Sequence, residues 1–119
     1  MYDPSVAKTL ALPERERGAC CAVELTVAPK RAAEISDVLK ALADPTRVQM
    51  ILTLRAAKSP VCICDFTPAL SLSQPTVSHH MGKLREAGLV EATRSGIWTY
   101  YAIRHDLPER VRRIVDALV

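Results

Sequence analysis

The chain has 119 residues, a formal net charge of +3 and four cysteines; 49% of its residues are hydrophobic but only 4% are aromatic. This length suits one small domain with an aliphatic core rather than two domains. No apolar run reaches the ~18 residues of a membrane span, and the N-terminus lacks the apolar stretch of a signal peptide, so we expect a cytoplasmic protein without membrane contact. Cytosolic cysteines rarely form a disulfide framework, which leaves metal binding, redox chemistry or burial.

Residues 1–31 are predicted to form a mobile N-terminal arm. The segment 1–18 contains prolines and alternating charges but no sustained hydrophobic period. The arm then carries Cys20 and Cys21, whose side chains would point to opposite sides of an extended chain. Chance placement or partial burial is the alternative interpretation of this pair.

Two amphipathic helices are predicted next, at the start of a folded unit that spans residues 32–119. Apolar residues at helical spacing indicate a helix over residues 32–43. Asp44 then serves as the N-cap of a second helix, Pro45 takes its first position, and an apolar stripe continues to about Ala56. The two helices are therefore expected to meet at a sharp corner.

A helix-turn-helix is predicted in the middle of the chain. A short helix over residues 66–70, capped by Asp65, precedes a longer helix that begins after the N-cap Ser73 and ends before Gly88. The longer helix has a narrow buried stripe with the spacing i, i+4 and i+7, formed by Val77, Met81 and Leu84. Two helices joined by a short turn are typical of DNA-binding proteins.

The outer face of the longer helix carries short hydrogen-bonding side chains and cations, the types that contact base edges and phosphates. An ordinary solvent-exposed helix is the alternative interpretation. The predicted DNA contacts are Gln74, Thr76, Ser78 and His79, with His80 and Lys83 nearer phosphate. For single residues, Ser78 facing the helix groove and His80 being partly packed are the alternatives.

After the helix-turn-helix the pattern changes to two strands, residues 89–93 and 97–103, joined by a turn at residues 94–96. Arg94 is expected at the tip of this β-hairpin wing, where it would reach phosphate or a narrow minor groove. A last amphipathic helix over residues 107–118 offers an apolar face for dimerisation. The predicted fold class is mainly α with a β-hairpin wing (α+β), a homodimeric winged helix-turn-helix.

Cys62 and Cys64 form a CxC pair just before the short helix. Residues i and i+2 lie about 200° apart in a regular helix, so one ion bound by both requires non-helical backbone here. A helix N-terminus would also lower the thiol pKa and favour the thiolate that a soft ion needs. The alternative is that both residues are small buried hydrophobes.

Over roughly residues 32–103 the chain resembles the ArsR/SmtB family of metal-sensing winged-helix repressors, in the runs DPTRVQMILTL, VCICDF, SLSQPTVSHHMGKLREAGLV and GIWTYYAI. The resemblance implies a homodimer that binds operator DNA without the ion and leaves it when the ion binds. Similar arsenic-responsive members have a CxCDxC run that supplies three thiolates. Here Cys62, Cys64 and Asp65 match that run, but Thr67 stands at the position of the third cysteine.

This departure implies a site that also uses the arm. Some arsenic repressors of the family are similar in having adjacent arm cysteines, and its cadmium and lead sensors combine arm cysteines with a CxC pair. The expected inducer is As(III) or Sb(III), which would derepress arsenic-resistance genes; a four-thiolate Cd(II) or Pb(II) site is the rival. For As(III) or Sb(III), three thiolates are expected to come from Cys20, Cys21 and one or both of Cys62 and Cys64.

Other functions are less well supported by the sequence. A zinc site on the last helix, known in the family, is not expected, because the candidate ligands there include one histidine only: His105, Asp106, Glu109 and Asp116. A thiol redox switch that joins an arm cysteine to Cys62 or Cys64 is a second functional class. An enzyme is not expected, since no nucleophile, base and orienting group occur at usable spacing.

Overall fold

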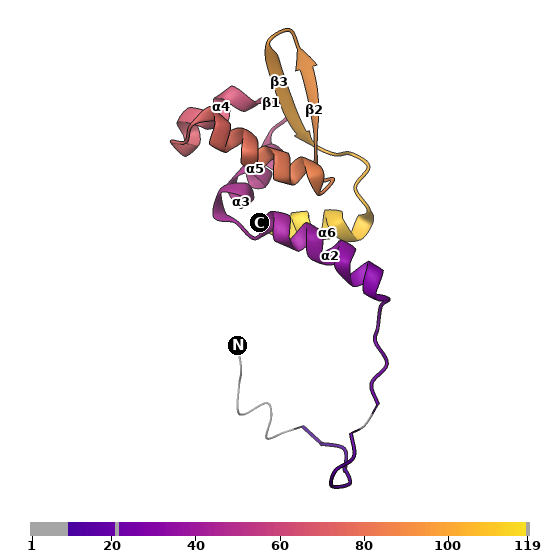
Figure 1. The fold of residues 1–119 in the computed structure, drawn as a ribbon. Helices are drawn as coiled ribbons and strands as arrows, with labels where there is room; N and C mark the ends of the chain where they lie inside the picture. Colours follow the sequence, from indigo (N-terminus) through magenta and orange to yellow (C-terminus); the bar gives the residue numbers. More distant parts are fainter. Residues whose placement is uncertain (1–9, 21, 119) are drawn as a thin grey trace.

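The computed structural model describes residues 10–20 and 22–118, and it shows a folded domain preceded by an extended N-terminal segment (Figure 1). None of the helices in these residues is long and apolar enough to cross a bilayer. The elements in chain order are α2 (Pro29–Leu42), α3 (Pro45–Ala56), β1 (Val61–Cys62), α4 (Ile63–Leu70), α5 (Gln74–Glu86), β2 (Val90–Ser95), β3 (Trp98–Ile103) and α6 (Glu109–Ala117).

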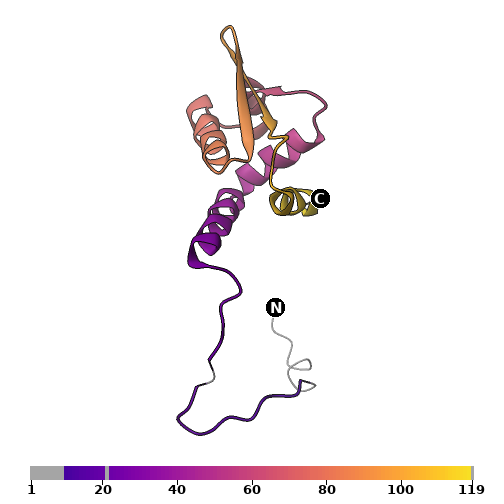
Figure 2. The same cartoon turned by 90° about the vertical axis from the view of Figure 1, so that its right-hand side faces the viewer.

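The domain has two ends with different roles. Helices α2 and α6 lie side by side at one end, next to the point where the N-terminal segment leaves the domain, and the wing projects from the other end beside α4 and α5 (Figures 1 and 2). The three strands form an antiparallel sheet in the order β1-β3-β2. This arrangement is a winged helix-turn-helix, so the predicted fold class is confirmed.

The helix-start signals in the sequence are used as predicted. Asp44 Oδ2 accepts a hydrogen bond from the backbone N–H of Arg47 at 3.0 Å, and Pro45 opens α3. Ser73 caps α5 in the same way through the backbone N–H of Thr76. Gly88 has a φ of +76°, the left-handed conformation that closes a helix at the C′ position.

Three helix boundaries differ from the predictions. Helix α2 begins at Pro29 rather than at residue 32, because Ala28 is an extended N-cap and Pro29 occupies a position where its missing N–H costs nothing. Helix α4 begins at Ile63 rather than at residue 66, so Asp65 is not its N-cap but lies in its first turn; the N-cap is Cys62. Helix α6 is shorter than predicted at both ends, Glu109–Ala117.

The wing also differs in register from the prediction. Ser95 pairs with Trp98, so the turn consists of Gly96 and Ile97. The prediction of a turn at residues 94–96 is therefore wrong, because the turn begins two residues later and ends one residue later. Arg94 belongs to β2 and pairs with Thr99. Strand β1 was not predicted, because a two-residue strand carries no periodic signal and forms only through its pairing with β3.

The core is aliphatic, as the low aromatic content indicates. The predicted α5 stripe of Val77, Met81 and Leu84 is fully buried, together with Met50 and Ile51 of α3. Helix α5 packs on α3, α4 and β2, which fixes its rotation in the domain. The opposite side of α5 is therefore held toward solvent.

One arginine joins the end of α2 to α5. Arg47 Nε donates to the carbonyl oxygen of Ala41 at 2.6 Å, and Nη2 donates to that of Lys40 at 3.4 Å. These carbonyls belong to the last turn of α2; that of Lys40 also accepts from the backbone N–H of the C-cap Ala43 at 3.3 Å. Arg47 Nη1 lies 3.2 Å from His80 Nδ1 on α5, so this nitrogen of the imidazole acts as an acceptor.

We predict that Arg47→Met lowers the free energy of unfolding by about 1–3 kcal/mol, because the carbonyl oxygen of Ala41 on α2 and Nδ1 of His80 on α5 lose their Arg47 donor. Urea unfolding followed by circular dichroism measures this change. The matched control is Arg55→Met, which removes a partly exposed ion pair with Asp116 (N–O distance 3.0 Å) and should cost about 0–1 kcal/mol. Equal losses for the two variants would contradict the role assigned to Arg47.

Candidate functional site

The exposed face of α5 is the first part of the candidate site. Gln74, Thr76, Ser78, His79 and Lys83 are all exposed on this helix, while the buried stripe faces the core. The Thr76 hydroxyl lies 2.9 Å from the Ser73 hydroxyl, so the capping interaction orients it at the first turn. Lys83 Nζ is 3.8 Å from a carboxylate oxygen of Glu86, a loose and exposed contact.

His80 lies differently from the other predicted DNA contacts. Its side chain is only 17% exposed and points to the corner between α2 and α3, where it meets Arg47 and lies 3.7 Å from Asp44 Oδ2. The structure therefore shows the partly packed arrangement given above as the alternative. The sequence analysis missed Arg47, although its position three residues after the cap Asp44 places it at the helix corner.

The wing is the second part of the candidate site. Arg94 is exposed on β2 near the hairpin tip, and its Nε donates to the carbonyl oxygen of Gly96 at 3.3 Å. This hydrogen bond uses only Nε of the guanidinium. Arg94 is thus available to an anionic partner while its backbone stays fixed in the β2–β3 ladder.

The two cysteines of the CxC pair converge at the start of α4. Cys62 has an extended backbone, with a φ of −66° and a ψ of 137°, and it forms the last residue of β1 as well as the N-cap of α4. Cys64 lies in the first turn of that helix. The pair therefore straddles the boundary between strand and helix, and its sulfur atoms are 2.9 Å apart.

The protonation of this pair corrects an expectation. We expected the helix N-terminus to lower the thiol pKa, but the hydrogen bond with Cys62, followed by desolvation, raises the pKa of Cys64 to about 11. Two thiolates at this distance would repel each other, and the nearby Asp65 adds to the negative charge. The free pair thus keeps a proton until an electrophilic centre replaces it.

Thr67 occupies the next turn of α4 on the side of Cys64, since residues i and i+3 are neighbours on a helix. Its hydroxyl oxygen is buried and has no hydrogen-bond partner in the described part of the chain. The polar atom at this position is therefore close to the thiol pair in sequence and space but is not a thiolate. This position therefore offers no third sulfur beside Cys62 and Cys64.

The arm supplies the remaining thiols. Cys20 is exposed in the extended segment, whereas Cys21 lies outside the described residues. Within residues 10–20 and 22–118, no three His, Cys, Asp or Glu side chains are grouped as a metal site. Figure 1 shows the extended segment before α2 leaving the domain at the α2 end, and the described residues do not include a grouping of Cys20 with the CxC pair.

The carboxylates near α6 are engaged by arginines. Arg104 forms two hydrogen bonds to Asp106, at 2.9 and 2.8 Å, and these bonds lower the pKa of Asp106 to about 2. Asp116 accepts from Arg55, and Glu109 accepts from Arg113 at 2.9 Å. These three carboxylates thus each take part in an ion pair with an arginine.

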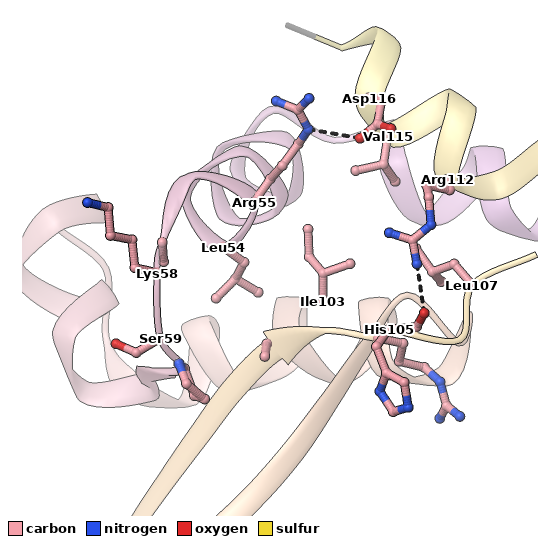
Figure 3. A pocket seen from close by; sticks show the side chains of 14 residues that line it. Leu54, Arg55, Lys58, Ser59, Ile103, His105, Leu107, Arg112, Val115 and Asp116 are labelled. Atoms are coloured by element: carbon pink, nitrogen blue, oxygen red, sulfur yellow. Dashed lines mark hydrogen bonds and ion pairs between the residues drawn. The ribbon is translucent and has the colours of Figure 1, made fainter. Parts of the chain in front are cut away.

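A groove of about 300 Å³ lies between the end of α3, the end of β3 and α6 (Figure 3). Leu54, Ile103 and Leu107 form its apolar part. At its edges, Arg55 bonds to Asp116, and Arg112 Nη2 donates to the carbonyl oxygen of His105 at 2.8 Å. These two contacts fasten α6 to the domain, so the polar groups of the groove have a structural use.

Comparison with known proteins places these features in a family. The family model for bacterial regulatory proteins of the arsR family matches residues 44–92. The arsenic resistance transcriptional regulator ArsR1 of Pseudomonas putida is 42% identical over 82 residues, which cover 69% of this chain and 63% of that protein. The arsenical resistance operon repressor of Escherichia coli is 37% identical over 79 residues, which cover 66% of this chain and 67% of that protein.

A solved structure gives the same result. The homodimeric winged helix-turn-helix DNA-binding domain from Mycobacterium bovis has a TM-score of 0.64 and 28% identity, and the match covers 82% of this chain and 86% of that one. The matched region contains the helix-turn-helix and the wing described above. The chain belongs to the ArsR family of bacterial regulatory proteins, which are DNA-binding transcriptional regulators and not enzymes.

Proposed function

We propose that the chain is a dimeric repressor that acts in the cytoplasm and leaves its operator DNA when thiolates bind As(III) or Sb(III), which derepresses arsenic-resistance genes. The observation that carries this proposal is the convergence of Cys62 and Cys64, with 2.9 Å between their sulfur atoms, at the start of the helix-turn-helix. The arsenic-resistance regulators with 42% and 37% identity support the choice of ion.

The DNA-reading surface in this proposal is the exposed face of α5. Gln74, Thr76, Ser78 and His79 contact base edges and Lys83 contacts phosphate. His80 acts through Arg47 instead, by holding α5 against the α2–α3 corner. In a dimer, two copies of α5 would enter successive major-groove segments about 34 Å apart.

The dimer would use the faces of α2 and α6. Ile35 and Val38 of α2 and Val111 and Ile114 of α6 line an apolar groove of about 290 Å³ at the end of the domain opposite the wing. Leu39 of α2 is 49% exposed although it is apolar. A domain of this size has few other surfaces that a second copy could cover, and the homodimeric relative supports this assembly.

Arsenite can react with cysteine thiols that remain protonated, as the raised pKa of Cys64 implies for this pair. Arsenious acid exchanges its three hydroxyl groups for three thiols, forming three As–S bonds and three water molecules without net release of protons. Cys62 and Cys64 provide two of the sulfurs, and Cys20 or Cys21 provides the third. Cys20 stands nine residues before Pro29, so an extended arm reaches about 30 Å from the start of α2, in its own or the partner subunit.

Ion capture would act on α4 and through it on α5. Cys62 is fixed in the sheet by pairing with Tyr100, whereas Cys64 is part of α4. When one arsenic atom binds both sulfurs and an arm thiol, it pulls the first turn of α4 out of its helical position. Helix α4 packs directly on α5, so α5 moves as well. To move the population from 1:99 to 99:1, the ion must favour the released state by about 5.5 kcal/mol.

We predict that Cys62→Ser and Cys64→Ser each abolish the release of operator DNA by arsenite, because the ion then no longer joins the strand residue Cys62 to Cys64 in the first turn of α4. Fluorescence anisotropy of a labelled operator, titrated with arsenite, measures the release. DNA affinity without arsenite should stay within about threefold of wild type, since neither residue belongs to the DNA face. Normal release from both variants would place the site elsewhere.

The matched variant is Thr67→Cys in a chain that also carries Cys20→Ser and Cys21→Ser. The parent double variant should not respond to arsenite, and Thr67→Cys should restore the response by placing a third sulfur one turn after Cys64. Restoration would show that the arm serves only as a sulfur donor. A normal response of the parent double variant would remove the arm from the site.

We predict that the arsenite response is nearly independent of pH between about pH 6 and 8.5, because the exchange with protonated thiols releases no net proton. A four-thiolate Cd(II) or Pb(II) site, the alternative function, would bind more tightly as the pH rises, since each ion displaces protons from groups such as Cys64, whose pKa is about 11. Operator release by each ion, titrated at several pH values, separates the two. Release of the operator at low Cd(II) concentration, together with weak release by arsenite, would favour the alternative function.

A thiol redox switch is the second candidate, and the short distance between Cys62 Sγ and Cys64 Sγ favours it. Oxidation would join two thiols in a disulfide and release two electrons to an oxidant such as peroxide. Peroxide would then release the operator in the absence of any ion. Release by peroxide alone, reversed by dithiothreitol, would replace the arsenite mechanism.

We predict that Lys83→Ala weakens binding to all DNA sequences alike and flattens the salt dependence by about one unit per lost phosphate contact. Affinity measured at several salt concentrations gives this slope. The matched control is Arg113→Ala, which removes one positive charge from α6 at the other end of the domain and should leave the slope unchanged. An unchanged slope for Lys83→Ala would take Lys83 off the phosphate backbone.

A further inference from the structure

The tip of the wing exposes large apolar side chains. Ile97 is 82% exposed and Trp98 is 48% exposed, at the apex of a hairpin that projects from the domain (Figures 1 and 2). Neither side chain contributes to the buried core. Exposed apolar groups at the end of a projecting element mark an interaction surface rather than a stabilising one.

The geometry of the turn and the strand pairing determine on which face of the hairpin Trp98 and Arg94 lie. Gly96 has a φ of +60° and opens a two-residue turn, with Ile97 as the second residue. Because partners across a ladder share a face and neighbours along a strand alternate, Trp98 and Arg94 lie on opposite faces of the hairpin. The tip thus has an apolar apex, an indole on one face and a guanidinium on the other.

The fold itself does not require Ile97. A two-residue turn that begins with glycine favours a small polar residue such as Asn or Ser at its second position. The β-branched Ile97 is unfavourable there and makes no burial gain in compensation. The reason for an apolar apex is therefore to be found in a partner.

We propose that Ile97 acts as an apolar wedge at a base step of the minor groove that the wing is expected to reach, with Trp98 against sugar and base faces and Arg94 on the phosphates. This inference rests on the proposed DNA binding and adds to it a role in sequence choice. Apolar wedges unstack and kink flexible steps such as TA and CA/TG. The wing therefore favours operators that carry such a step beside the segment read by α5.

DNA is a better partner for this surface than another protein because of the charge beside the apex. The exposed Arg94 is held by the carbonyl of Gly96, so a cation accompanies the apolar group at a fixed position. Minor grooves combine a strongly negative potential with apolar sugar faces, and both features are matched here. The wing also lies beside the helix-turn-helix and away from α2 and α6.

Trp98 is the single tryptophan of the chain, so its fluorescence reports on the wing alone. The test uses the full chain and a duplex selected for binding from a random-sequence library. When the duplex binds, Trp98 fluorescence should be quenched by the bases and become protected from acrylamide. If Trp98 in the complex remains as accessible to acrylamide as in the free protein, the proposal is overturned and the tip faces no DNA.

The variant Ile97→Asn separates DNA binding from folding. Asparagine suits the turn, so the thermal unfolding temperature should stay equal or rise, while affinity for the selected duplex falls about tenfold or more. Fluorescence energy transfer between the duplex ends should show a smaller bend, and Ile97→Leu should retain both affinity and bend. Unchanged affinity and bend for Ile97→Asn would contradict the wedge. Failure of the wild-type chain to bind any selected duplex would instead contradict the proposed function itself.

Discussion

The contact on which the arrangement of the molecule depends is the guanidinium of Arg47 between two helices. It occupies the last carbonyls of α2, which forms part of the apolar face proposed for dimerisation, and it meets His80 on α5, which carries the DNA-reading face. The backbone of the same residue donates to the cap Asp44, and this hydrogen bond lowers the pKa of that carboxyl. The positions of the dimer surface and the DNA surface are thus linked through one side chain.

In the proposed function, control acts at a second junction, the boundary between β1 and α4. Cys62 belongs to the sheet and Cys64 to the helix, so any ligand that requires both sulfurs acts across that boundary. The ladder keeps Cys62 in place, while the first turn of α4 is held by the burial of Ile63 in the core rather than by ladder hydrogen bonds. In the proposed mechanism, an ion bound here would have Cys62 as its fixed anchor and Cys64 as its movable one, and α4, which carries Cys64, packs directly on α5.

The sequence predicted the features that depend only on neighbouring residues, namely the helix caps, the helix end and the buried face of α5. The caps Asp44 and Ser73, the left-handed Gly88 and the buried stripe of α5 follow from hydrogen-bonding and burial rules that need no distant partner. Tertiary contacts determine the features that the sequence did not predict. Strand β1 forms through its pairing with β3, and the His80 side chain points inward because it contacts Arg47, 33 residues earlier in the chain. The raised pKa of Cys64 likewise depends on the approach of Cys62, which spacing alone does not give.

The proposed arsenic site consists of the CxC pair and one arm thiol. X-ray absorption at the arsenic edge of the arsenite-loaded protein measures it, because the amplitude and distance of the first coordination shell give the number and type of ligands. We expect three sulfur neighbours and no oxygen in the wild-type chain, and a loss of one sulfur when Cys20 and Cys21 are both replaced by serine. Three sulfurs in that double variant, or an oxygen ligand in the wild-type chain, would rule out this site.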